Sequence, residues 1–319
     1  MEIYMKTLKK LSLTLAASVS TLAGIHMLNS YIAKNSIKNN ITNLSNHFYE
    51  TKFGKISFYE AGTGTPIILL HNLSSYSSSF EWKKIIPALS KTHKVYAIDM
   101  LGCGYSDKPN ITYTTFMYVQ ILENFINDII KEKTDIVASG LSSSIAIMAY
   151  RYNPNIINNI ILINPIEVKK ATLIPDKNSI IRKKMIHLPI LGTLLYNICT
   201  SQYHIKKYLM AHGNYTNFKT LELLTQIRHE TAHLSGYASK YIYMCIDGYY
   251  TTASIDKAIQ KLNNIHIIIG EQLKNANDII SQYCSINDNI SVTAIKNSAV
   301  YPEIENSLSV VKTIRKICN

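Results

Sequence analysis

Short runs of continuous apolar residues recur along the chain from residue 66 onward. A strand buried on both faces has this pattern, because side chains pointing to either face meet other apolar groups. The runs stand at residues 66–71, 95–100, 135–139, 160–164, 266–270 and 291–295. We therefore predict core strands of a sheet that is covered on both faces.

The stretches between these runs have apolar residues at a spacing of three to four, which is typical of helices that bury one face. These stretches are residues 82–89, 115–130, 141–150 and 303–317. Strands that alternate with helices form a mostly parallel, doubly wound sheet. Apolar and polar residues alternate over 48–53 and 55–60 with Gly54 between them, which predicts a hairpin at an antiparallel edge.

Residues 167–262 interrupt this order of strands and helices. They contain no convincing strand, and helical pieces such as 188–196 and 221–233 dominate. An all-helical insertion at this point predicts a lid over the carboxyl edge of the sheet, where open α/β sheets bind their ligands.

The N-terminal segment, residues 1–34, has a different pattern. Lys6, Lys9 and Lys10 precede an uncharged stretch over 11–33, and about 20 such residues span a bilayer core. The length favours an uncleaved membrane anchor over a signal peptide cleaved near Ala23 or a buried soluble helix. Basic residues on both flanks weakly favour a domain on the extracytoplasmic side.

The region that follows divides into two parts. Residues 35–47 are polar and Asn-rich and are predicted to be a tether, and residues 48–319 form the folded domain. We expect the domain to have a sizeable core, because 47% of the 319 residues are apolar and 17% are charged.

Charge and cysteine content exclude several classes of function. The net charge is +12, but the lysines are scattered, so we interpret it as compositional bias and expect no nucleic-acid partner. No cysteine pair has CxxC spacing, which disfavours a cysteine zinc site or a thioredoxin-type motif, and the length of the chain disfavours a disulfide framework. We expect no metal and no cofactor. The five cysteines are Cys103, Cys199, Cys245, Cys284 and Cys318.

Several motifs stand in the order found in one large family. The most specific is Asp99 to Pro109, which reads D-x-x-G-x-G-x-S-D-K-P after a predicted strand. It is accompanied by Leu69-Leu70-His71-Asn72, Trp82, Asn164-Pro165 and Leu188-Pro-Ile-Leu-Gly192. The chain thus resembles the α/β-hydrolase family. The resemblance implies a mostly parallel eight-stranded sheet with helices on both faces and a helical lid.

The resemblance also places the catalytic positions of that family. Its G-x-S-x-G elbow, which carries the nucleophile between strand and helix, aligns with Ala138-Ser139-Gly140-Leu141-Ser142, so Gly140 takes the nucleophile's position. Leu273 falls on the acid and Val300 on the histidine. None of these three side chains transfers or orients a proton. The implied pocket and oxyanion region consists of His71, Asn72, Leu73 and Leu141.

Other residues are candidates for a rebuilt active site. Ser139, Ser142, Ser143 and Ser144 cluster at the elbow, and His71 is the nearest base. Glu167 follows a predicted strand and is a candidate acid, and Cys103 is a candidate thiolate nucleophile. The alternative is a structural role for each residue: the serines begin a helix, His71 supports the oxyanion loop, and Cys103 replaces an apolar side chain.

One further pattern points to a different chemistry. His229-Glu230-x-x-His233 matches the zinc-binding H-E-x-x-H helix, with Glu230 as general base, but no third ligand follows at the expected spacing. His266 lies in a predicted strand and is interpreted as structural.

Two functions remain open from the sequence. The first is a membrane-held member of the fold without Ser-His-Asp chemistry, which binds a small apolar or acyl ligand under the lid or a protein that the sequence does not identify. The alternative is an active esterase-like or lipase-like hydrolase with a non-canonical serine or cysteine nucleophile.

Overall fold

A single mixed sheet forms the centre of the computed structural model, which describes residues 1–39, 41, 47–215 and 217–318. The strand order is β1-β2-β4-β3-β5-β6-β7-β8, and β2 is antiparallel to both neighbours while the other pairs are parallel. The predicted α/β sheet and its edge hairpin are confirmed. The strands are β1 (His47–Thr51), β2 (Gly54–Ala61), β3 (Thr65–Leu70), β4 (His93–Ile98), β5 (Thr134–Ser139), β6 (Ile157–Ile163), β7 (Ile265–Gly270) and β8 (Ser291–Ile295).

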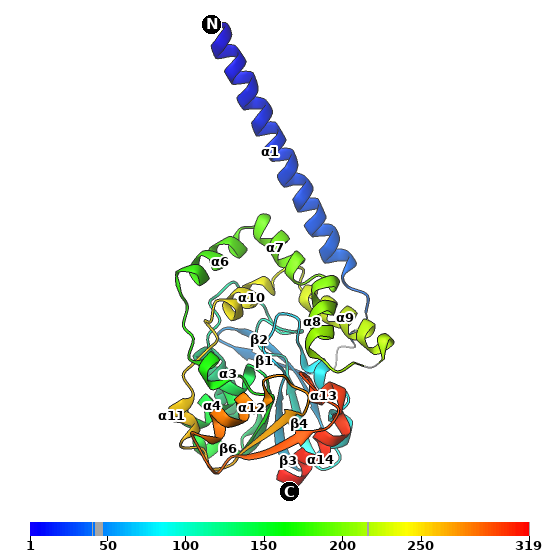
Figure 1. Ribbon diagram of the computed structural model, residues 1–319, viewed down its shortest axis with the longest axis vertical. Helices are drawn as coiled ribbons and strands as arrows, with labels where there is room; N and C mark the ends of the chain where they lie inside the picture. The colour runs from blue at the N-terminus through cyan, green and yellow to red at the C-terminus, as the bar shows by residue number, and fades with distance from the viewer. Residues whose placement is uncertain (40, 42–46, 216, 319) are drawn as a thin grey trace.

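Helices cover both faces of this sheet (Figure 1). Apart from the short 3-10 helices η1 (Ser79–Trp82) and η3 (Pro154–Ile156) and the π-helical turn η2 (Ile126–Ile130), they are α-helical. The α-helices are α1 (Glu2–Asn35), α2 (Ile86–Leu89), α3 (Thr115–Phe125), α4 (Ser142–Tyr152), α5 (Val168–Ala171), α6 (Lys177–His187), α7 (Leu191–Cys199), α8 (Gln202–His212), α9 (Phe218–His233), α10 (Lys240–Asp247), α11 (Asp256–Ile259), α12 (Ala276–Cys284), α13 (Pro302–Glu305) and α14 (Ser307–Cys318).

The core has two layers because successive side chains of a strand point to opposite faces. In β3, Ile67 and Leu69 pack with α2 and α14, whereas Ile68 and Leu70 pack with α3 and α4. All four side chains are fully buried. This two-sided burial is why β3 is apolar without alternation.

The predicted helical insertion lies between β6 and β7 and comprises α5 to α11. No strand occurs in its described residues, 167–215 and 217–262. The helix expected over 188–196 begins only at Leu191, because Leu188 precedes a proline and takes an extended conformation.

Two other predicted helices are wrong in extent. Residues 82–89 form only the end of η1 and the single turn α2. The helix predicted over 303–317 is divided at Asn306, whose backbone leaves the helical region between α13 and α14. In both places the helical spacing of apolar residues continues although the backbone does not form one continuous helix. The spacing alone therefore predicts one longer helix.

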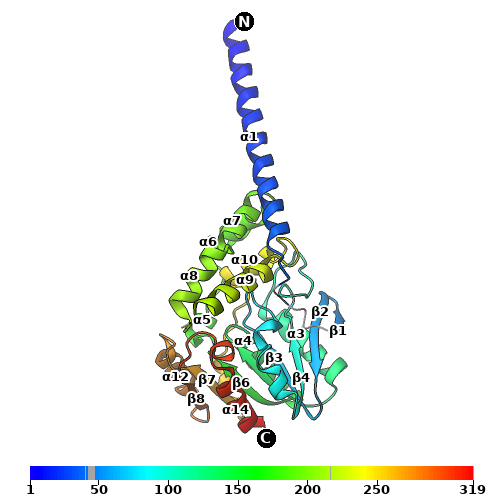
Figure 2. The same ribbon diagram turned by 90° about the vertical axis from the view of Figure 1, so that its right-hand side faces the viewer.

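Helix α1 projects from the domain in both views (Figures 1 and 2). Residues Tyr4–Asn35 are long and apolar enough to cross a membrane, with a mean hydropathy of 1.5, and none of the apolar window is buried. The end of α1 contacts the insertion. Asn29 Nδ2 donates to the Ile190 carbonyl at 3.0 Å, and Asn197 Nδ2 donates to Asn29 Oδ1 at 2.9 Å.

The predicted tether, residues 35–47, lies partly outside the described residues, which omit 40 and 42–46. Its described part contacts the domain. Ser36 Oγ lies 3.0 Å from His229 Nε2, and Ile41 is buried.

Candidate functional site

The turn between β5 and α4 is centred on Gly140. Its φ is +55°, a left-handed conformation that glycine adopts without the strain of a side chain. The Gly140 amide donates to the Ile163 carbonyl of β6 at 2.9 Å. The sharp turn that presents a nucleophile in the resembled family is therefore present here without a side chain.

Asn72, in the loop after β3, covers this turn. Its Oδ1 accepts a hydrogen bond from the Leu141 amide at 3.0 Å. A Cβ added at Gly140 would lie only 2.6 Å from Asn72 Cγ, closer than real Cβ contacts. In the G-x-S-x-G elbow, the amide that follows the nucleophile is an oxyanion donor. Here the equivalent amide is already paired with Asn72.

His71 holds the loop that carries Asn72. The Met100 amide donates to His71 Nε2 at 3.0 Å, so the ring proton is on Nδ1, which donates to the Asn72 carbonyl at 2.8 Å. Both nitrogens of this fully buried ring are occupied. His71 is therefore placed as a support of the loop rather than as a base.

The structure brings Gly140, Leu273 and Val300 to one cavity of about 340 Å³, which we call the elbow cavity. They reach it from the carboxyl ends of β5, β7 and β8. Asn164, at the end of β6, joins the ends of β7 and β8, because its Nδ2 donates to the Val300 carbonyl at 2.9 Å and its Oδ1 accepts from the Gly270 amide at 2.8 Å. In the sequence Asn164 stands out only as part of the Asn164-Pro165 motif, and this role was not predicted.

The candidate serines are all buried, and none has a histidine side chain as hydrogen-bond partner among the described residues. Ser142 Oγ donates to the His71 carbonyl at 2.6 Å, and Ser143 Oγ donates to the Gly140 carbonyl at 2.6 Å. Ser144 Oγ has no hydrogen-bond partner among the described residues. Of the four, Ser139 alone lines the elbow cavity, and its Oγ donates to Glu303 Oε1 at 2.8 Å.

Cys103 and Glu167 are poorly placed for the roles considered. Cys103 is fully buried, donates from Sγ to the Ser74 carbonyl at 3.3 Å, and does not line the elbow cavity. Burial raises the pKa of its thiol to about 12, which disfavours a thiolate. Glu167 lines the rim of the elbow cavity, where its Oε1 accepts hydrogen bonds from Lys170 and Asn275.

Sequence reasoning missed Glu303. It follows Pro302 at the start of α13, where acidic residues are common, so nothing in the sequence separated it from an ordinary helix start. The side chain is fully buried, and burial, followed by the nearby charge of Glu81, raises its pKa to about 8. Glu303 is thus mostly protonated at neutral pH, next to the one candidate serine that faces the cavity.

We expect Glu303→Gln to flatten the dependence of stability on pH. Between pH 4.5, its ordinary pKa, and pH 8 the folded chain retains a proton that the unfolded chain loses, so stability falls as pH rises through this window. The glutamine variant should match the parent near pH 4.5 and be more stable at pH 8.5. Thermal unfolding across this range tests it, with the exposed Glu271→Gln as control. If the stability of parent and variant changed equally with pH, the raised pKa of Glu303 would be contradicted.

A buried ion pair lies beside Glu303. Arg228 of α9 and Glu81 of η1 approach to 3.0 Å, with side chains 4% and 8% exposed. The guanidinium lies over the Tyr301 ring at 4.2 Å. This pair joins the insertion to the sheet domain.

The two histidines of the H-E-x-x-H pattern serve as structural links. His229 Nδ1 and Nε2 lie 2.9 Å from the Thr200 carbonyl and 3.0 Å from Ser36 Oγ. His233 Nε2 lies 3.2 Å from Asn197 Oδ1, and burial lowers its pKa to about 4. Within the described residues, no group of three potential ligands is placed to hold a metal ion. The zinc-site interpretation does not fit this geometry.

His266 of β7 is half-buried, and its Nε2 lies 2.9 Å from Thr293 Oγ1 of the neighbouring strand. This cross-strand contact fits the structural role expected from the sequence.

Comparisons with known proteins give one consistent fold. A family model described as "alpha/beta hydrolase fold" matches residues 65–188. The chain is 31% identical over 107 residues to 2-hydroxy-6-oxo-6-(2'-aminophenyl)hexa-2,4-dienoic acid hydrolase of Metapseudomonas resinovorans, a match that covers 33% of this chain and 37% of that protein. Matches to eight curated relatives span only 31% to 43% of those relatives' lengths.

Solved structures extend the similarity beyond the matched segment. A serine hydrolase involved in carbazole degradation superposes with a TM-score of 0.66 at 17% identity, covering 85% of this chain and 97% of that one. A structure titled as a membrane phospholipase A and bacterial virulence factor has a TM-score of 0.67 at 16% identity. That superposition covers 100% of this chain and 98% of the other.

Proposed function

The chain belongs to the α/β-hydrolase fold superfamily, and from this premise we propose that it is a membrane-held member without serine-hydrolase activity that binds an apolar or acyl ligand under its lid. The observation that carries the proposal is the elbow. Gly140 offers no nucleophile, and Asn72 occupies the amide that would stabilise an oxyanion.

Serine-hydrolase chemistry needs three cooperating groups and an oxyanion site. Gly140, Leu273 and Val300 supply none of the three groups at the elbow cavity, although they lie together there. Acyl transfer through these three positions therefore lacks both the attacking atom and the base that would activate it.

A second candidate function rests on Ser139. Its 2.8 Å hydrogen bond to Glu303 and its position on the elbow cavity are what a rebuilt nucleophile would need. Glu303 accepts the serine proton only when it is ionised, above its raised pKa of about 8. This candidate thus requires activity that rises in alkaline solution.

The test is an assay of the full chain with short p-nitrophenyl esters and a fluorophosphonate probe, at pH 7 and pH 9. We expect no turnover above buffer and no stoichiometric labelling. Ester hydrolysis that is lost in Ser139→Ala and in Glu303→Gln would overturn the proposal in favour of the second candidate. Loss in Cys103→Ala or Ser142→Ala would favour the other non-canonical nucleophiles.

The membrane part of the proposal rests on α1 and on the surface beside it. Helices α6 and α7 lie at the end of the domain from which α1 projects (Figures 1 and 2). Six large apolar side chains on them are between 36% and 56% exposed: Ile180, Ile181, Met185, Leu191, Leu195 and Ile198. An exposed apolar surface next to a membrane-spanning helix favours contact with the bilayer. The match in fold to a structure titled as a membrane phospholipase supports the same location.

Two truncations separate anchoring from folding. A chain that begins at Asn29 retains the contacts of Asn29 and Ser36 with the insertion, and we expect it to fold and to leave the membrane fraction on carbonate extraction. A chain that begins at residue 37 loses these partners, which costs about 1–3 kcal/mol for each buried polar group left unpaired. Limited proteolysis should cut its insertion faster. Equal protease resistance would contradict the link between α1 and the insertion.

A further inference from the structure

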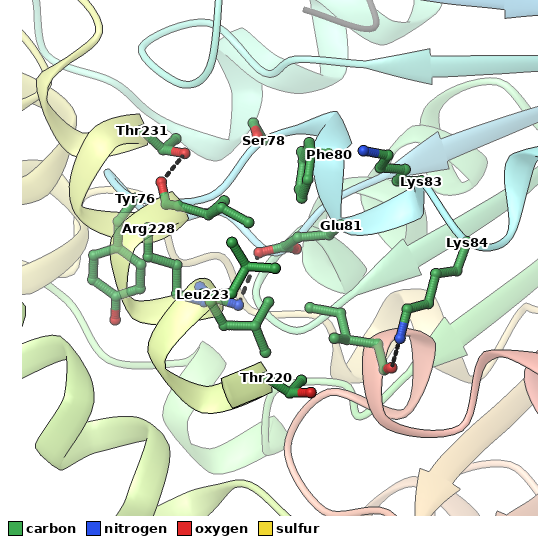
Figure 3. Close-up of a pocket in the computed structure, with 13 residues that line it drawn as sticks. Tyr76, Ser78, Phe80, Glu81, Lys83, Lys84, Thr220, Leu223, Arg228 and Thr231 are labelled. Atoms are coloured by element: carbon green, nitrogen blue, oxygen red, sulfur yellow. Dashed lines mark hydrogen bonds and ion pairs between the residues drawn. The ribbon is translucent and has the colours of Figure 1, made fainter. Parts of the chain in front are cut away.

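A second and larger cavity, of about 520 Å³, lies between α9 and the segment around η1 (Figure 3). It shares no lining residue with the elbow cavity. Its volume falls within the range of about 300–1,000 Å³ typical of small-molecule sites. We call it the α9 cavity. Its apolar and aromatic lining consists of Tyr76, Phe80, Leu223, Leu224, Ile227 and Ile304.

The wall between the two cavities is built from charged and aromatic groups. Arg228 lines the α9 cavity, and Tyr301, on which its guanidinium stacks, lines the elbow cavity. Glu81 holds Arg228 in place by the ion pair drawn in Figure 3. A ligand in the α9 cavity is therefore separated from Gly140.

The inner end of the α9 cavity suits an uncharged chain. Ile227 and Ile304 are at most 9% exposed. The only ionised groups there among the lining residues are Arg228 and Glu81, which neutralise each other. A further charge placed at this depth would be desolvated without a counter-ion, at a large cost in free energy.

The outer end of the cavity carries positive charge. Leu223 is 50% exposed there, and Lys83 and Lys84 stand on the opposite side (Figure 3). Lys83 Nζ lies over the Phe80 ring at 4.9 Å, and Lys84 Nζ reaches the Ile304 carbonyl at 3.5 Å. Neither ammonium group has an ion-pair partner within the described part of the chain. Both are placed to receive an anion.

We propose that the α9 cavity binds a single-chain amphiphile with an anionic head group, with the chain on Ile227 and Ile304 and the head group on Lys83 and Lys84. The inference rests on the ligand-binding part of the proposed function and moves that ligand away from the elbow. A fatty acid and a lysophospholipid share the required chemistry.

The experiment uses the full chain in phosphatidylcholine nanodiscs and a diazirine-bearing palmitate. Saturable photolabelling should map to residues 76–84 and 220–231. Leu223→Trp fills the cavity mouth and should reduce labelling about tenfold. Val300→Trp fills the elbow cavity instead and should change the photolabelling little. Leu173→Trp adds a tryptophan at an exposed leucine of the insertion and should also change the photolabelling little.

Competition defines the head group. Unlabelled palmitate or lysophosphatidylglycerol should displace the probe, whereas uncharged hexadecanol should not displace it. The stronger of the two anionic competitors shows which head group the site prefers. Reversal of both lysines, Lys83→Glu with Lys84→Glu, should weaken palmitate binding about tenfold, while Lys52→Glu with Lys91→Glu leaves it unchanged. Unsaturable labelling, labelling lost in Val300→Trp, or equal competition by hexadecanol would overturn the inference. The absence of ester turnover tests the proposed function separately.

Discussion

Gly140→Ala destabilises the domain by about 2–5 kcal/mol, even though it adds only one methyl group. Part of the cost is backbone strain, because a side chain at a φ of +55° is unfavourable. A second part is overlap, because the new Cβ would lie 2.6 Å from Asn72 Cγ and force the carboxamide off the Leu141 amide. Thermal unfolding of the full chain measures the loss.

Gly236 provides a matched control. Its φ is +68°, but no atom lies within 4 Å of an added Cβ, so Gly236→Ala bears strain without overlap and should cost only about 1–2 kcal/mol. In an Asn72→Gly background, Gly140→Ala should likewise cost only the strain. Full additivity of Asn72→Gly and Gly140→Ala would show that Asn72 does not fill the nucleophile's place.

Asn72 also limits any attempt to build a serine-hydrolase site at this elbow. A serine at position 140 meets the carboxamide of Asn72, and its oxyanion donor is already bonded. We therefore expect no ester turnover from Gly140→Ser alone, or from a triad completed at positions 273 and 300, until Asn72 is also made small. In the proposed function, the loop after β3 prevents hydrolysis together with the three positions of the triad.

The central strands were predictable because burial on both faces leaves few polar positions, and β3 was predicted to within one residue at each end. The bounds of β8 were also correct, at 291–295, but its predicted burial on both faces was wrong, because β8 is an edge strand in which only Ile295 is buried. Helix ends were less predictable. The break at Asn306 depends on local backbone geometry, which leaves the apolar spacing of 303–317 intact.

The candidate site also has features that the sequence predicted and features that it did not. The sequence order of motifs predicted that Gly140, Leu273 and Val300 come together, and one cavity contains all three. The resemblance placed Asn72 and Leu141 in one oxyanion region, but not the hydrogen bond between them, which joins residues 69 positions apart and has no local signature. The burial of Glu303 could not be predicted from the sequence either, because acidic residues are common at helix starts and are usually exposed there.

The other large effect concerns the ion pair between Arg228 and Glu81. Arg228→Met keeps most of the volume against Tyr301 but leaves the Glu81 carboxylate buried without a cation, so we expect a loss of about 3–5 kcal/mol. Thermal unfolding of the full chain measures the loss.

Two variants make this prediction specific to the buried pair. Adding Glu81→Gln to Arg228→Met removes the unpaired carboxylate but keeps an acceptor for the Asn72 amide. Most of the lost stability should therefore return. Arg182→Met breaks an exposed pair with Asp247 of similar length, 2.8 Å, and should cost less than about 1 kcal/mol. If Arg228→Met costs no more than Arg182→Met, this pair does not stabilise the wall between the two cavities.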